Sequence, residues 1–79
     1  MDDEELYSRL GLVFDRVFGD GTVKLTPELT ADDVDGWDSV THVRLLLSVE
    51  REFKIKIKTS EIGKLENVGD LVSLIRARL

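Results

Sequence analysis

The sequence contains no cysteine, a single proline and a single histidine. Without cysteine the chain cannot form a disulfide, offers no thiolate ligand to a metal and has no thiol nucleophile of its own. It has no internal repeat, and no stretch rich enough in polar residues, Pro and Gly to act as a linker. No apolar run approaches the length that spans a membrane, so we expect no membrane insertion.

The length of 79 residues predicts one domain, residues 1–79, near the size at which a single core is only just adequate. An apolar fraction of 42% and a charged fraction of 34% are typical of a globular domain and argue against disorder. The first five residues are acidic after Met1, unlike a secretory signal or an organelle transit peptide. We therefore expect a cytoplasmic monomer.

The net charge of −5 is unevenly distributed. Residues 1–39 hold eleven acidic and three basic residues, whereas residues 40–79 hold five acidic and eight basic ones. The acidic half would repel phosphates, so we expect no nucleic-acid partner. The basic residues of the second half would suit an acidic protein, a phosphate or simply a solvated face.

Hydrophobic periodicity predicts an all-α fold: a small bundle of three main helices and one short helix, with a long loop between the first and second helices. The first main helix follows the stripe from Leu6 to Val17 and should end at Gly19 and Gly21. The second spans Val40 to Phe53, where apolar residues cover more than half of the circumference. The last begins with Asn67 as N-cap and runs towards Leu79.

Two connections join these helices. Residues 22–36 form the long one, which Val23, Leu25 and Leu29 should tether to the core, with a single short turn at 30–33. Residues 53–58 alternate as a β-strand would, but no second such run exists to pair with them, so we predict an extended connector with Ile55 or Ile57 in the core. Thr59 or Ser60 should then cap a short helix that reaches Leu65 and is weakened by Gly63.

The junction Gly36-Trp37-Asp38-Ser39-Val40 presents a serine hydroxyl at the opening of the most apolar helix. Gly36 permits unusual backbone angles, and Asp38 and Ser39 are both residue types that cap helices. Ser39 and His42 are neighbours on that helix, which raises the possibility of a nucleophile and its base. A hydrolase also needs an oxyanion hole and a cleft, for which so small a bundle has little room, so we disfavour this reading.

Two further alternatives are weak. In the loop 31–36, Asp33 and Asp35 fall on calcium-ligand positions, but Ala31 and His42 occupy two positions that need acidic ligands, so we predict no metal site. A helix-turn-helix reading fails because the strongest basic cluster lies on the connector and the protein is acidic overall.

The motif Asp38-Ser39-Val40, at the start of an apolar helix that ends in Glu50-Arg51-Glu52-Phe53, resembles the Asp-Ser-Leu signature of acyl carrier proteins. The similarity continues through Phe53-x-Ile55-x-Ile57 and the segment 67–71, and extends to total length, acidity and the long first loop. The resemblance implies a carrier, not an enzyme, that holds acyl intermediates as thioesters on a 4′-phosphopantetheine arm. A chain without cysteine needs such an arm for its thiol.

The resemblance implies that a phosphopantetheinyl transferase attaches this arm to Ser39 from coenzyme A, with Asp38 helping to present the serine. Trp37 is expected to pack the loop against the bundle or contact the arm. An acyl chain would retract between residues that equally suit ordinary core packing: Val40, Val43, Leu47, Ile57 and Ile62.

Partner enzymes of lipid or polyketide synthesis would meet the second helix at Val40, Arg44, Glu50 and Glu52. Arg44 stands where fatty-acid carriers often have an acid, which favours a specialised carrier with dedicated partners. An aminoacyl or peptidyl carrier, and a helical interaction module that is never modified, remain open alternatives. The sequence does not identify the cargo or the pathway.

Overall fold

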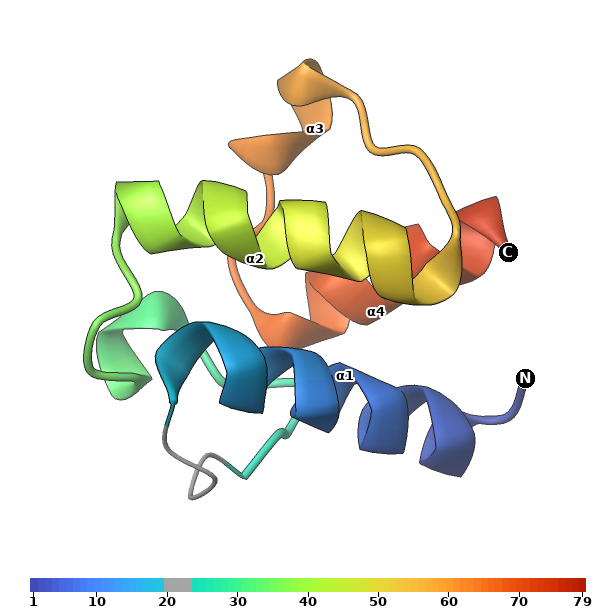
Figure 1. Cartoon of the computed structure of the whole chain (residues 1–79), viewed down its shortest axis with the longest axis horizontal. Helices are drawn as coiled ribbons and strands as arrows, with labels where there is room; N and C mark the ends of the chain where they lie inside the picture. The colour runs from blue at the N-terminus through green and yellow to red at the C-terminus, as the bar shows by residue number, and fades with distance from the viewer. Residues whose placement is uncertain (20–23) are drawn as a thin grey trace.

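The computed structural model describes residues 1–19 and 24–79, and in these the chain is all-helical. The elements are α1 (Asp3–Phe18), the short 3₁₀ helix η1 (Ala31–Asp33), α2 (Ser39–Phe53), α3 (Thr59–Ile62) and α4 (Val68–Arg78). In Figure 1, α1 and α2 lie side by side, with α4 behind them and α3 on the side of the bundle away from α1. The predicted all-α fold with three main helices and one short helix is confirmed.

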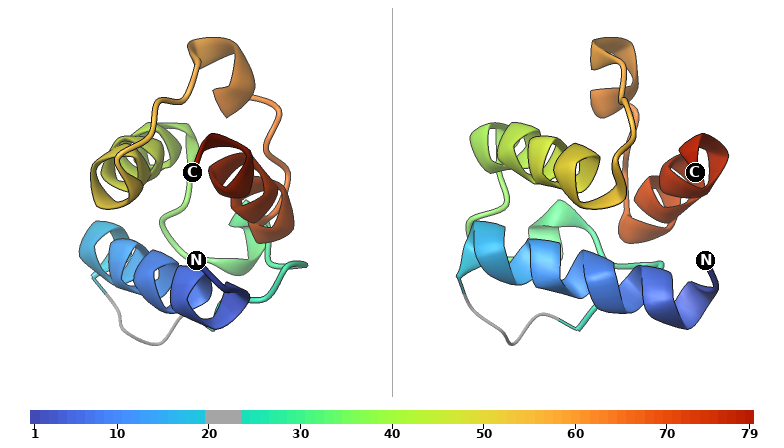
Figure 2. Two further views of the ribbon diagram at one scale, coloured as in Figure 1. Left: turned by 90° about the vertical axis from the view of Figure 1, so that its right-hand side faces the viewer. Right: turned by 45° about the vertical axis from the view of Figure 1, so that its right-hand side comes forward.

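The three main helices enclose one apolar core, and Figure 2 (left) shows them around it. Each contributes one face of buried side chains, since residues three and four apart share a face. The buried residues are Leu6, Leu10, Val13 and Phe14 from α1, Leu45, Leu46, Val49 and Phe53 from α2, and Val68, Leu71, Val72 and Ile75 from α4, joined by Ile55 of the connector.

Both ends of α1 are capped. Asp2 is the N-cap, and its carboxylate accepts the Glu5 amide at 2.8 Å. Gly19 takes a left-handed conformation and ends the helix. The expected second stop, Gly21, and the expected anchor, Val23, lie outside the described residues.

The long loop is attached to α4 by backbone hydrogen bonds as well as by side chains. Leu25 and Leu29 pack against the core, as predicted. In addition, the first two amides of α4 donate to the loop: Val68 N–H to Leu29 O and Gly69 N–H to Pro27 O, each at 2.9 Å. A Cβ at residue 69 would lie 3.1 Å from the Pro27 oxygen, so a larger residue there would push the loop away by a few tenths of an ångström. The loop thereby satisfies amides that α4 cannot bond internally.

The connector after α2 is extended, and it carries Ile55 into the core, with Ile57 half-buried beside it. The prediction of a connector in place of a strand is confirmed within the described residues. Glu50 organises this segment, because its side chain accepts the Ile57 amide at 2.7 Å. The expected cap of the next helix was wrong: α3 begins at Thr59 with Lys58 at the N-cap position, where Glu61 accepts the Lys58 amide at 2.9 Å.

Salt bridges link the helices around the core. The carboxylate of Glu52 on α2 forms salt bridges with two arginines of α1, Arg9 (Nε–Oε2 3.0 Å) and Arg16 (Nη1–Oε1 3.3 Å). Arg76 of α4 pairs with Asp3 of α1, and Arg78 of α4 pairs with Glu61 of α3. None of the described helices is long and apolar enough to cross a bilayer.

Candidate functional site

The start of α2 is a tightly bonded turn that leaves one hydroxyl outside it. Asp38 is the N-cap, and its Oδ1 accepts the amides of Val40 and Thr41, each at 3.0 Å. The Thr41 hydroxyl accepts the Asp38 amide at 2.7 Å and donates to Gly36 O at 2.6 Å. Gly36 has φ +86°, which favours glycine and turns the chain into the helix.

Ser39 is the first residue of the helix and not its cap. Asp38 performs the capping that the sequence allowed for either residue, so the interpretation of Ser39 as a cap was wrong. In the described part of the chain no hydrogen bond engages the Ser39 hydroxyl, and the residue is exposed. The hydroxyl is therefore available for chemistry, while its neighbour holds the backbone in place.

The Asp38 carboxylate is electrostatically stabilised by its role as cap. The Thr41 amide lowers its pKa most, desolvation opposes this, and the Val40 amide lowers it further. Asp38 therefore stays ionised near neutral pH.

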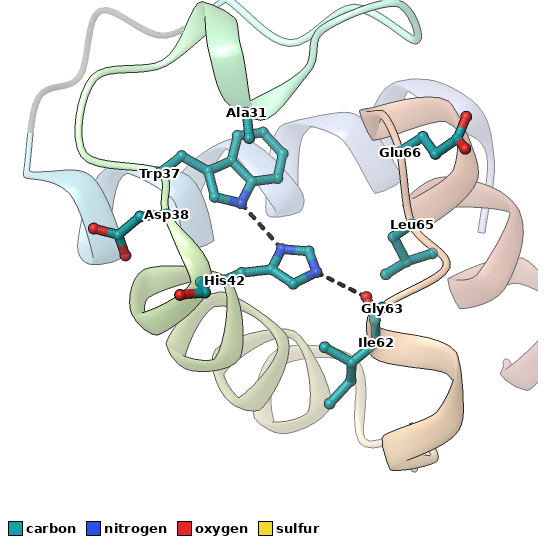
Figure 3. A pocket seen from close by; sticks show the side chains of 9 residues that line it. Ala31, Trp37, Asp38, His42, Ile62, Gly63, Leu65 and Glu66 are labelled. Carbon is teal, nitrogen blue, oxygen red and sulfur yellow. Dashed lines mark hydrogen bonds between the residues drawn. The ribbon is translucent and has the colours of Figure 1, made fainter.

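A pocket of about 280 Å³ opens beside Ser39. Its lining comes from three parts of the chain, the η1 segment, the start of α2 and the segment that follows α3: Ala31, Trp37, Asp38, Ser39, His42, Ile62, Gly63, Leu65 and Glu66. Figure 3 shows Trp37, His42 and Ile62 in a row across this space. The pocket thus joins an exposed hydroxyl to a mostly apolar wall.

His42 connects the two sides of the pocket. The Trp37 indole N–H donates to His42 Nδ1 at 3.0 Å, and His42 Nε2 lies 2.9 Å from the carbonyl oxygen of Ile62 (Figure 3). Indole nitrogen only donates and a carbonyl oxygen only accepts, so the imidazole is neutral and carries its proton on Nε2. The two rings also stack, with centroids 6.0 Å apart.

His42 is a partly exposed residue of the first turn of α2, as predicted. The ring is half-buried and both nitrogens are engaged. Neither nitrogen is left to accept a proton from Ser39, which removes the basis for a nucleophile and base pair. The only sequence signal was the five-residue spacing from Trp37, which by itself predicts no contact.

Trp37 packs the loop against the bundle, which is the first of the two roles expected for it. Its ring meets Phe14 edge-on at 5.4 Å between centroids and lies 6.0 Å from that of Phe18, both on α1. One loop aspartate has a structural role too. Asp33 belongs to the capping box of η1 and accepts the amide of the N-cap residue, Thr30, at 3.0 Å. No group of three or more metal-binding side chains is present in residues 1–19 and 24–79.

Comparison with known proteins identifies the family. A protein named acyl carrier protein from Thermotoga maritima is 32% identical over 76 residues, which cover 96% of this chain and 94% of that protein. The chain belongs to the acyl carrier protein family. Another acyl carrier protein, from Acidothermus cellulolyticus, is 33% identical over 91% of this chain and 86% of its own length. No family model matches.

A solved structure agrees with this assignment. The solution structure of holo acyl carrier protein from Geobacter metallireducens is 42% identical and superposes with a TM-score of 0.84, covering 91% of this chain and 83% of that one. A meromycolate extension acyl carrier protein from Mycolicibacterium smegmatis is 31% identical over 92% of this chain and 74% of its own length.

For this member of the acyl carrier family, the structure separates the residues that the sequence grouped as an acyl pocket. Ile62 lines the pocket beside Ser39. Ile57 is half-buried against the core. Val43 and Leu47 are exposed on α2, as is Val40, so the expectation that these three fill the core was wrong. An apolar stripe wider than one helix face cannot show from sequence which members face outwards.

The predicted partner-binding residues also fall into two groups. Val40 and Arg44 are exposed. Glu50 and Glu52 are half-buried and bonded within the molecule, to the connector and to α1 respectively. Sequence reasoning missed Leu65 and Ala31 as lining of the pocket, because both come from segments without regular periodicity.

Proposed function

We propose that Ser39 carries a 4′-phosphopantetheine arm, transferred from coenzyme A by a phosphopantetheinyl transferase. The chain would then hold acyl groups as thioesters and present them to enzymes of lipid or polyketide synthesis. It would act as a carrier, not an enzyme, and as a cytoplasmic monomer. The observation that supports this most is the exposed hydroxyl of Ser39, which bonds to none of the described residues and lies beside a pocket, in a chain of the acyl carrier family.

The residues around Ser39 fit such an arm. A phosphodiester on the Ser39 oxygen would sit at the positive end of α2, which favours a negative group. The pocket next to it offers the rings of Trp37 and His42 and the side chains of Ile62 and Leu65 to an extended, partly apolar chain. When bound, the arm supplies the thiol that a chain without cysteine lacks.

The residues of the chain have separate tasks in this proposal. Asp38 fixes the first turn, so that Ser39 is presented on rigid backbone. Its carboxylate would also help to hold the metal ion of the transferase beside the phosphate. In the transfer, the Ser39 oxygen would bond to the phosphorus of the pantetheine phosphate, the pyrophosphate linkage of coenzyme A would break, adenosine 3′,5′-bisphosphate would leave and the transferase would take the hydroxyl proton. His42 keeps the pocket wall together and handles no proton.

The proposal is tested by intact mass after incubation with coenzyme A and a transferase of broad specificity. The wild type should gain the mass of one phosphopantetheine arm, and Ser39→Ala should gain none. Ser60→Ala is a matched control, since Ser60 is also an exposed serine in the first turn of a helix, and it should load like the wild type.

Two results would overturn the proposal. If the wild type gains no mass, the chain is an unmodified helical module. If Ser39→Ala gains the arm, another residue is the attachment site. Acylation of the loaded chain, followed by its release with hydroxylamine, then tests whether the cargo is held as a thioester.

A further inference from the structure

One face of α2 is apolar and exposed. Val40, Val43 and Leu47 have 68%, 45% and 55% of their surface accessible. Arg44 and Arg51 are exposed among them. At ~100° per residue, these five residues fall within an arc of about 100° on the helix surface. We call this set the outer face of α2.

The acidic residues of α2 do not belong to the outer face. The helix has only two, Glu50 and Glu52. Glu50 accepts the Ile57 amide at 2.7 Å, and Glu52 is tied to Arg9 and Arg16 with only 17% of its side chain exposed. Both carboxylates are thus directed to other parts of the same molecule. The charge that α2 offers to a partner is positive.

The positive charge continues past the end of the helix. Lys54, Lys56 and Lys58 of the connector are all exposed. A surface hollow of about 460 Å³ lies where this basic segment meets the outer face, and it is lined by Leu47, Glu50, Arg51, Lys54, Ile55 and Lys56. One carboxylate, that of Glu50, thus lies among three cations. Apolar side chains, a hollow and several cations therefore share one side of the molecule.

We propose that the outer face of α2 docks enzymes that present acidic residues around an apolar surface, and that the first of these is the chain's own phosphopantetheinyl transferase. This inference rests on the proposed function. Val40 directly follows Ser39, so an enzyme that reaches the Ser39 hydroxyl approaches the start of this face. Arginine among apolar side chains is typical of protein interfaces. Opposite charge on the partner steers the encounter and excludes enzymes with basic docking surfaces.

Charge favours an acidic enzyme over other occupants. An anionic membrane would attract the outer face but repel residues 1–39, which hold eleven acids and three bases. A symmetric dimer through this face would bring Arg44 and Arg51 near the same residues of the second copy. An acidic protein surface meets neither obstacle, because it needs to contact only this side of the molecule.

The test measures kcat/KM for loading by the transferase encoded in the same genome. Reversal of charge in Arg44→Glu/Arg51→Glu should lower kcat/KM about tenfold or more, because like charges would then face each other across the interface. For the wild type, kcat/KM should fall as salt is added, and the double variant should lose this dependence. Lys24→Glu is the matched control: Lys24 is exposed next to Leu25, which lines a cavity against α1, and this variant should stay within about twofold of wild type.

Loading to completion at long times, with an unchanged circular dichroism spectrum, shows that the double variant is folded and that Ser39 is intact. Equal or faster loading of that variant would then overturn the docking inference while the proposed function stands. Binding of the wild type to phosphatidylcholine and phosphatidylglycerol vesicles, or a dimer in sedimentation that the double variant loses, would assign the face to a different occupant and also overturn it. Failure of the wild type to load with any transferase would instead remove the proposed function.

Discussion

The two residues at the start of α2, Asp38 and Ser39, differ in what their side chains do. The Asp38 carboxylate is held by two backbone amides, whereas Ser39 is the first helical residue and is exposed. Either residue type can cap a helix, so the sequence does not decide between them. In the structure Asp38 is the cap, because Thr41 stands at the third helical position and its hydroxyl accepts the Asp38 amide in a capping box.

A residue-scale prediction concerns Trp37 and His42. In the wild type the imidazole should be the neutral form with its proton on Nε2, because the indole N–H donates to Nδ1. Trp37→Phe keeps an aromatic ring against Phe14 but removes this donor. We expect it to lower the free energy of unfolding by about 1 kcal/mol, the usual contribution of one hydrogen bond.

The imidazole nitrogen signals of ¹⁵N-labelled protein report the position of the proton, and urea unfolding reports the stability. A wild-type ring with its proton on Nδ1 would contradict the contact between Trp37 and His42. In that case Trp37→Phe would also leave the nitrogen signals of His42 unchanged.

At the scale of elements, α2 has two neighbouring leucines with opposite surroundings. Leu46 is 1% exposed in the core, and Leu47 is 55% exposed on the outer face. Leu46→Ala should lower the free energy of unfolding by about 2–5 kcal/mol, through lost apolar burial and the cavity it leaves. Leu47→Ala should change it by no more than about 0.5 kcal/mol. Urea unfolding of the two variants, each against the wild type, measures both effects.

The same pair tests the assignment of faces on α2. Comparable losses in the two variants would mean that Leu47 is a core residue and that no outer face exists. The expected pattern instead assigns to Leu47 an effect on docking: Leu47→Ala should slow loading by the chain's own transferase while the fold stays intact.

Most elements could be predicted from the sequence because their signals are local. Periodic apolar residues predict α1 and α4, with Asn67 as the cap of α4, and the lack of a partner run predicts that 53–58 is not a strand. The outward position of Val40, Val43 and Leu47 could not be predicted, since α2 carries more apolar residues than its neighbours cover. The backbone hydrogen bonds between the loop and α4 could not be predicted either, because Pro27 and Gly69 come together only in the folded chain.

At the scale of the whole molecule, carboxylates couple folding to pH. The pKa of Glu52 is lowered from 4.5 by the hydrogen bond from Arg9 first and that from Arg16 next, and that of Glu61 is lowered by the Lys58 amide first and Arg78 next. The pKa of Asp38 is lowered as well. The unfolded chain therefore binds more protons, so stability is full above about pH 4.5 and is lost as the pH falls through the lower, folded-state pKa values.

Urea midpoints across this acid range check the linkage. The wild-type midpoint should be steady near neutral pH and should fall below about pH 4.5. The Glu52→Gln variant should have a lower urea midpoint at neutral pH, and its midpoint should fall less steeply with acid. The reason is that the substitution removes an ionisable carboxylate that bridges α1 and α2. An acid slope equal to that of the wild type would mean that Glu52 is not coupled to folding.

The site as a whole could be only partly predicted. The motif singled out Ser39 and Asp38, and the family resemblance included Ile62 among five residues around an acyl chain. The pocket beside Ser39 was not predicted, because its wall joins residues 31, 37, 42, 62 and 65, which come from three separate parts of the chain. This wall forms only when those segments pack together, so no local sequence pattern predicts it.

The account depends most on Ser39 as the point of attachment, and peptide mapping of the loaded chain tests this directly. Trypsin should release the peptide 25–44, which contains Ser39 and Thr41 among its hydroxyl residues. Fragmentation of this peptide by mass spectrometry locates the added arm. We predict that the arm is on Ser39 alone. An arm on another residue, or a peptide without any arm after complete incubation with coenzyme A and transferase, would contradict the account.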